Sequence, residues 1–143
     1  MASAKGNGVA LVKNIIKFVG EGGGFDKLLE KVKVVSAGEG RCLVEMVVEE
    51  RHLNKGGTLH GGFTATLIDS ISTFALMTRG GGAPGVSVNM NINYLKPATE
   101  GEEILIDAQT KRAGRTLAFL EVDITKKNSG ELVATGSHVK FIG

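Results

Sequence analysis

The chain is organised around Asn54-Lys55-Gly56-Gly57-Thr58-Leu59-His60-Gly61-Gly62, a glycine-rich stretch that leads into residues 63–78. From position 56 to position 78 the titratable groups are one carboxylate, Asp69, and one imidazole, His60. Moving a fixed charge out of water costs several kcal/mol unless a partner compensates it. A lone aspartate in such a run therefore predicts the working group of an active site. The alternative is a buried structural acid that Thr or Ser hydroxyls cap.

Residues 61–77 are predicted to form a long helix. Its apolar stripe consists of Leu67, Ile71, Phe74 and Ala75, and the side that carries Asp69 has the small residues Gly62, Ala65, Thr66, Ser72 and Thr73. The helix start leaves backbone N–H groups free where the dipole favours a developing negative charge. A carbonyl bound there would be polarised as in an oxyanion hole. Two turns along the helix, Asp69 could activate water.

The flanking segments alternate with the period of two that is typical of strands. Two strands with a turn at 37–40 precede the helix, and a third follows it at 86–94, where apolar residues alternate with Ser87 and three asparagines. Further strands are expected to begin near 104, 116 and 131. Short turns make neighbouring strands antiparallel. The predicted fold class is therefore α+β, with an antiparallel sheet of about six strands curled around the central helix.

A further helix is predicted at residues 5–19, from apolar residues at spacings of three and four. Its charges are all lysines, which fits a mitochondrial address, but the absence of arginine and the scarcity of serine favour a surface helix. The glycines at 20–24 break this helix, and residues 25–30 could add one more helical turn.

Composition limits the class of protein. A chain of 143 residues with 42% apolar and 22% charged residues describes one ordinary globular domain. A net charge of +2 without a Lys/Arg cluster argues against a nucleic-acid partner. No apolar run reaches the roughly 18 residues of a membrane span, and no secretory signal is recognisable. The single cysteine, Cys42, suits a reducing compartment and is expected in the core. We expect a cytoplasmic location, with the mitochondrion as the alternative.

The motif Asn54-x-x-Gly57-Thr58-x-His60-Gly61-Gly62, with Asp69 eight positions after Gly61, resembles that of the hotdog-fold acyl-CoA thioesterases. The likeness runs from Phe25 to the C-terminus and includes residues 83–88 and 114–119. It implies a hotdog fold, and it divides the chain into an N-terminal helix with a glycine-rich linker (1–24) and a thioesterase domain (25–143). The implied reaction is hydrolysis of medium- to long-chain fatty acyl-CoA to free acid and CoA.

The resemblance also implies roles for individual residues. Asp69 would activate the attacking water or attack the thioester itself, while Asn54 and the backbone N–H of Gly61 would polarise the thioester. Ser87 would help to hold the water. His60 is a further catalytic candidate, with the alternative that it orients the loop or satisfies a backbone group. Without the motif, Asn54 would be an ordinary turn or cap residue.

Coenzyme A is implied to run along two segments and one further residue: Tyr94, Leu95, Lys96, Pro97, Ala98 and Thr99; Arg112, Ala113, Gly114, Arg115, Thr116 and Leu117; and Phe141. Arg112 and Arg115 suit the phosphates, because a guanidinium fork matches phosphate oxygens. No metal or other cofactor is implied. The implied site lies between two protomers that pair their sheets, two such dimers form a tetramer, and a START-domain lipid-transfer protein is an implied partner.

Ser87 fits the strand pattern poorly. A period of two places it with the asparagines, away from the apolar face, so it either points across a dimer interface or follows a bulge that resets the alternation. His52 and His138 are predicted to be surface or strand residues, since the three histidines lack metal-ligand spacing.

Other enzyme classes lack their motifs. Residues 85–89 lack the final glycine of a nucleophile elbow, and no P-loop sequence is present. Two hypotheses remain: an acyl-CoA thioesterase, and a non-catalytic acyl-CoA sensor or scaffold on the same fold. The presence of Asp69, Asn54 and Gly61 together favours the enzyme.

Overall fold

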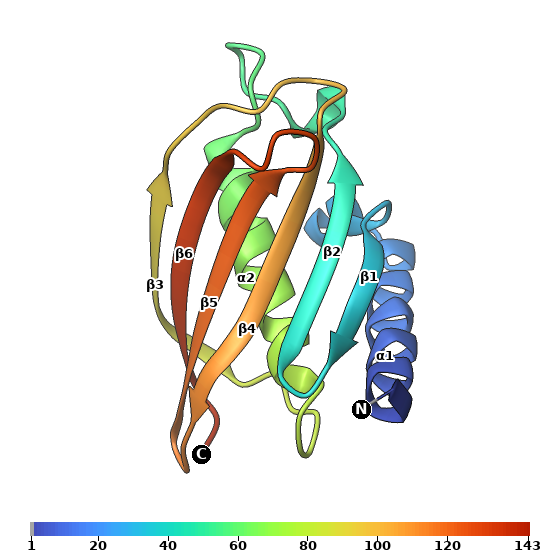
Figure 1. The fold of residues 1–143 in the computed structure, drawn as a ribbon, viewed down its shortest axis with the longest axis vertical. Helices are drawn as coiled ribbons and strands as arrows, with labels where there is room; N and C mark the ends of the chain where they lie inside the picture. The colour runs from blue at the N-terminus through green and yellow to red at the C-terminus, as the bar shows by residue number, and fades with distance from the viewer. Residues whose placement is uncertain (1) are drawn as a thin grey trace.

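The structure, a computed structural model, describes residues 2–143; Met1, the first residue of the predicted N-terminal segment, lies outside them. A six-stranded antiparallel sheet curls around helix α2 (Gly61–Met77) (Figure 1). The strands are β1 (Lys33–Gly38), β2 (Arg41–Val47), β3 (Val86–Tyr94), β4 (Glu103–Ala113), β5 (Leu117–Lys126) and β6 (Leu132–Phe141), in the order β1-β2-β4-β5-β6-β3. The predicted fold class and the predicted bounds of the central helix are confirmed.

Helix α1 (Ala2–Glu21) lies along β1 at one edge of the sheet (Figure 1). It is longer at both ends than the predicted 5–19, and its Val12 and Ile16 are buried in the main core. The predicted extra turn is a 3₁₀ helix, η1 (Phe25–Leu29). The division of the chain at residue 24 stays a prediction. Within residues 2–143, no helix combines the length and the apolar character needed to span a membrane.

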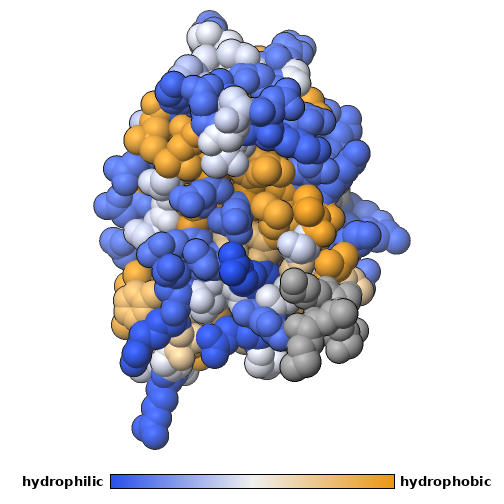
Figure 2. Space-filling model, in the orientation of Figure 1, coloured by the Kyte–Doolittle hydropathy of each residue, from blue (hydrophilic) through white to orange (hydrophobic). Residues whose placement is uncertain are grey.

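The core lies between α2 and the concave face of the sheet. Strands β2, β4 and β5 alternate buried and exposed residues, as their period of two predicts. Fully buried members of this core include Val44, Leu67, Ile71, Ile104, Ile106 and Ile124. The opposite face of the sheet mixes polar and apolar residues, and Figure 2 shows both kinds side by side on it.

Strand β3 departs from the prediction of one apolar core face. Val86, Val88 and Tyr94 are 67%, 60% and 58% exposed. The reason is position: β3 is an edge strand that pairs with β6 alone, and α2 barely reaches it. Alternation identified the strand correctly, but a local pattern cannot tell whether another element covers it.

A bulge in β3 explains the awkward phase of Ser87. Ser87 pairs with Lys140 and Asn89 pairs with Val139, so Val88 is the extra residue between two consecutive β6 positions. Such a bulge resets the alternation, which confirms the second of the two predicted explanations.

Ile68 of helix α2 lies directly against the backbone of β6 at Gly136. A Cβ atom at Gly136 would lie 2.8 Å from Cγ2 of the buried Ile68, closer than side-chain atoms pack. The absence of a side chain at this position therefore allows Ile68 to lie close to β6.

Gly136→Ala should lower the free energy of unfolding by about 1–3 kcal/mol, because the added methyl group overpacks the helix–sheet contact. The matched control is Gly81→Ala, since a Cβ there meets nothing within 4 Å. Urea unfolding followed by circular dichroism compares the two. Equal stability of both variants would contradict this account of the packing.

Candidate active site

The loop that carries the motif is closed by Asn54. Its Nδ2 donates to Thr58 Oγ1 at 2.9 Å, and its Oδ1 accepts from the Thr58 N–H at 3.1 Å. The ordinary turn role is thus present in the structure. A carboxamide nitrogen carries two hydrogens, so one N–H of the exposed Asn54 side chain stays available to a ligand.

The start of α2 presents a free backbone donor. His60 is the N-cap, and its Nδ1 accepts from the Gly62 N–H at 2.8 Å, so it satisfies a backbone group, as one of its predicted roles required. The Gly61 N–H has no acceptor among residues 2–143, while the Gly61 carbonyl accepts from the Tyr94 hydroxyl at 3.0 Å. A free N–H at the first position of a 17-residue helix is a favourable donor to a carbonyl oxygen that gains negative charge.

A pocket of about 310 Å³ brings the loop to the first predicted CoA segment. It is lined by Asn54, Thr58, Leu59, Gly61, Thr64, Tyr94, Leu95, Lys96, Pro97, Ala98 and Val133. Five of the six residues from Tyr94 to Thr99 are in this lining, and Thr99 itself pairs with Thr58 through an isolated bridge. The motif loop and the first predicted CoA segment of one chain therefore meet in this pocket.

The second predicted CoA segment lies elsewhere. Residues 112–117 form the turn between β4 and β5, at the end of the sheet opposite the motif loop (Figure 1). Phe141 is at that same end, opposite Val86 and Leu117 in the sheet. One chain therefore does not bring both segments to one pocket.

Asp69 is not the buried structural acid that the sequence left as the alternative, because its side chain is 51% exposed. Its neighbours on the small-residue side of α2, Ala65, Thr66 and Thr73, are half-buried, so the sheet covers this side only in part. Ser72, assigned to that side, is instead buried and contacts the sheet.

His138 is the residue that sequence reasoning missed. It is a strand residue, as predicted, but it is completely buried. Its Nδ1 lies 2.8 Å from Ser72 Oγ, its Nε2 lies 2.8 Å from Ser87 Oγ, and Nε2 is 3.9 Å from Asp69 Oδ1. Burial lowers the pKa of His138, and the negative charge of Asp69 only partly opposes this. The neutral ring therefore holds Ser87 beside Asp69. No sequence signal marked His138, because its spacing along β6 would be the same if it faced solvent.

His52 corrects a second prediction, because it is neither in a strand nor at the surface. It ends the 3₁₀ helix η2 (Glu50–His52), is buried, stacks on Phe63 with ring centroids 4.5 Å apart, and accepts from the Glu49 N–H. Its carbonyl accepts from the His60 N–H, so it supports the motif loop. Burial lowers its pKa.

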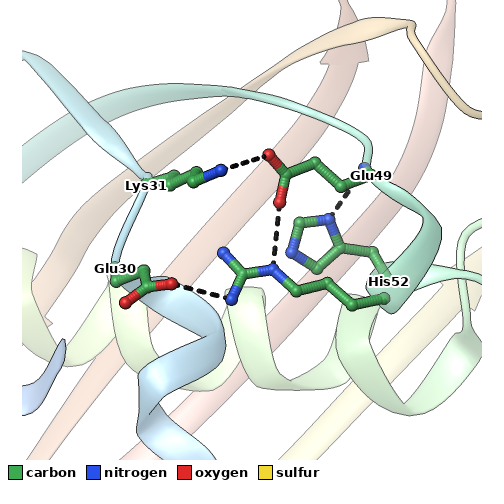
Figure 3. A network of polar contacts seen from close by, with 5 residues as sticks. Glu30, Lys31, Glu49 and His52 are labelled. Atoms are coloured by element: carbon green, nitrogen blue, oxygen red, sulfur yellow. Dashed lines mark hydrogen bonds and ion pairs between the residues drawn. The ribbon is translucent and has the colours of Figure 1, made fainter.

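The polar contacts in Figure 3 hold η2 in place. Glu49 accepts from Lys31 at 3.0 Å and from Arg51 at 2.9 Å, and Arg51 also donates to Glu30 at 2.8 Å.

Cys42 is buried in β2, as predicted, and burial raises the pKa of its thiol to about 12. Residues 2–143 contain no group of three or more His, Cys, Asp or Glu placed to hold a metal ion.

The distance between the two halves of the site limits what one chain can do. Gly61 and Asp69 are eight residues apart on one helix, which is about 12 Å along the axis at 1.5 Å per residue. A general base must lie within about 3 Å of the proton it takes, or act through one water. A carbonyl bound to the Gly61 N–H is therefore out of reach of Asp69 on the same helix.

Known proteins resemble this chain in sequence and in fold. Residues 56–133 match the model of the Thioesterase superfamily. The chain is 54% identical to acyl-coenzyme A thioesterase 13 of Mus musculus over 132 residues, which is 92% of this chain and 94% of that protein. It superposes on zebra fish thioesterase superfamily member 2 with a TM-score of 0.92 at 54% identity, over 94% of this chain and 98% of that one. A hypothetical thioesterase from Streptococcus pneumoniae, solved with coenzyme A, gives a TM-score of 0.75 at 30% identity, covering 80% and 87%.

The buried histidines predict a loss of stability in acid. In the unfolded chain a histidine takes up its proton near pH 6.5, whereas burial keeps His52 and His138 neutral to lower pH. Below about pH 6.5 the unfolded state thus binds more protons, so the free energy of unfolding falls as the pH falls. His138→Gln should reduce this slope by up to about 1.4 kcal/mol per pH unit. Urea unfolding from pH 8 to pH 5 measures both slopes, and an unchanged slope would exclude a neutral His138.

Proposed function

The chain belongs to the thioesterase superfamily, and from this premise we propose that it hydrolyses medium- to long-chain fatty acyl-CoA to free acid and CoA. The observation that carries the proposal is the free Gly61 N–H at the mouth of a pocket shared by Asn54 and residues 94–98. The relative named an acyl-coenzyme A thioesterase and the relative solved with coenzyme A support this substrate class.

The chemistry divides between the two halves of the site. The thioester carbonyl oxygen accepts from the Gly61 N–H and from the spare N–H of Asn54, which stabilise the negative charge of the tetrahedral intermediate. Water held by Ser87 attacks the carbonyl carbon while Asp69 takes its proton. The carbon–sulfur bond then breaks, and the departing CoA thiolate receives the proton. If Asp69 acts instead as the nucleophile, its carboxylate attacks the carbonyl carbon and expels the CoA thiolate, and water then hydrolyses the resulting anhydride, giving up its proton to the thiolate.

Two chains are needed to bring these halves together. Strand β3 is a long edge with exposed apolar side chains and unpaired backbone groups, which invites pairing with a second copy. If two chains pair around a two-fold axis with antiparallel α2 helices, Gly61 faces the partner's Asp69 when the axis passes beside Ala65. Ala65 and its neighbour one turn back, Gly62, are small enough for such close approach.

The same arrangement offers a place for the remaining CoA segment. The 112–117 turn lies at the opposite end of the chain from the pocket, and an antiparallel partner would bring its own turn toward that pocket. We propose Arg112 and Arg115 as phosphate contacts in this setting. The tetramer, the START-domain partner and the cytoplasmic or mitochondrial location stay predictions.

Asp69→Asn should reduce thiol release from acyl-CoA by about 10²-fold or more, because the amide cannot accept the proton of water. Asp123→Asn is the matched control, since Asp123 is an exposed acid on β5. A series of acyl-CoA chain lengths with detection of free thiol measures both variants and the preferred chain. Near wild-type hydrolysis by Asp69→Asn would remove Asp69 from the mechanism. Wild-type protein that releases thiol from no chain length would support the sensor alternative.

Mixing two inactive variants tests the shared site. In a heterodimer of Asp69→Asn and Asn54→Ala chains, one site carries both substitutions and the other carries neither, provided that each site takes Asp69 and Asn54 from different protomers. Co-refolding equal amounts should therefore restore roughly a quarter of wild-type activity, because half of the dimers are mixed and each has one intact site. If one chain supplied both residues, the mixture would stay as inactive as its parents.

A further inference from the structure

A lysine lies inside the molecule next to the catalytic cluster. Lys140 of β6 is 4% exposed and stands two residues after His138 on the same inward face. Its Nζ donates to Thr73 Oγ1 at 2.7 Å, and Thr73 Oγ1 donates to the backbone carbonyl of Asp69 at 2.8 Å. The hydrolysis described above makes no use of Lys140.

An ammonium group in such a place requires a reason. Burying a charge costs several kcal/mol unless opposite charge compensates it, and the hydrogen-bond partner of Lys140 is a neutral hydroxyl. Burial lowers the pKa of Lys140, and the negative charge of Asp69 opposes this, so the two side chains interact electrostatically. Asp69 lies one turn before Thr73 on α2, on the same side of the helix.

The groups around the ammonium come from four elements. Thr73 contacts it from α2, Asp69 lies one turn earlier on that helix, and His138 lies two residues before it on β6. Its neighbours in the sheet are Ser87 on β3 and Ala118 on β5, neither of which carries a charge. The titratable groups of this set are therefore one carboxylate and one imidazole. A nearby positive charge favours the ionised form of the carboxylate and the neutral form of the imidazole.

We propose that Lys140 is a positioning residue that serves as the counter-charge of Asp69, keeping the carboxylate ionised and the His138 ring neutral while acyl-CoA is bound. The proposal rests on the proposed function, in which Asp69 accepts a proton. A bound acyl group and a second protomer remove water from Asp69, and loss of water favours the protonated acid. A nearby cation favours the ionised form and so keeps the base ready.

The same charge protects the role of His138. A protonated ring would form an ion pair with Asp69, whose Oδ1 is 3.9 Å from Nε2, and would compete with the water for the carboxylate. The positive charge of Lys140 adds to burial in lowering the pKa of His138. The site thus keeps one buried cation, at Lys140, and leaves the imidazole free to hold both serine hydroxyls.

The test compares the pH dependence of kcat/KM in neutral and charged variants. Lys140→Met and Lys140→Gln remove the charge, and the Gln variant keeps a donor for Thr73. Lys140→Arg retains the charge. Lys127→Met is the control for net charge, because Lys127 pairs with Glu45 and Glu103 at another place on the sheet.

In both neutral variants the acidic limb of the profile should move upward by about one pH unit, so activity on that limb falls about tenfold. The Arg variant and Lys127→Met should keep the wild-type limb. A purely structural lysine would lower activity equally at all pH values and leave the limb in place. That result would overturn the proposal.

A second readout does not depend on catalysis. Removal of the Lys140 charge should raise the pH at which the His138 ring titrates in the substrate-free protein, as followed by NMR. An unmoved titration would overturn the counter-charge role even if activity changed. If the wild-type protein hydrolysed no acyl-CoA while the ring titration still moved, the charge arrangement would stand and the proposed function would fail.

Discussion

The close contact between Ile68 of α2 and Gly136 of β6 is the constraint on which the site depends. It allows the helix to lie deep against β6 at this point. At that depth, Ser72 reaches His138 and Thr73 reaches Lys140, the next two inward positions along β6. We expect a side chain at position 136 to push Ile68 away and to weaken both contacts. Packing of apolar atoms thus places the polar groups that carry the chemistry.

The second organising fact is that the sheet covers only one face of α2. The covered face holds the core, while the other face carries Asp69 among small residues and stays half-exposed. Strand β3, at the free edge of the sheet, is exposed as well. These surfaces and the roughly 12 Å between Gly61 and Asp69 together support the proposal that the working unit is a pair of chains, in which each chain contributes half of each site.

The polar and charged side chains near Asp69 depend on one another. Burial and the charge of Lys140 lower the pKa of His138, Lys140 donates to Thr73 one turn from Asp69, and Ser87 is held by the ring. Burial of His138 and Lys140 strengthens the interactions between these two groups and their partners. The arrangement explains why a lysine and a histidine remain inside a small domain, where apolar residues of similar size would pack at least as well.

By itself the sequence determined the elements and the centre of the site, because both are local. Periodicity identified the helix from Gly61 to Met77 and the strands, and the isolated charge of Asp69 marked the residue to examine. Tertiary structure alone decided that Asp69 is half-exposed, that β3 is an open edge, and that His138 and Lys140 face inward. The contacts of the last two join residues 66 and 67 positions apart. No local pattern records such a contact, since a polar residue in a strand has the same spacing whether it faces solvent or the helix.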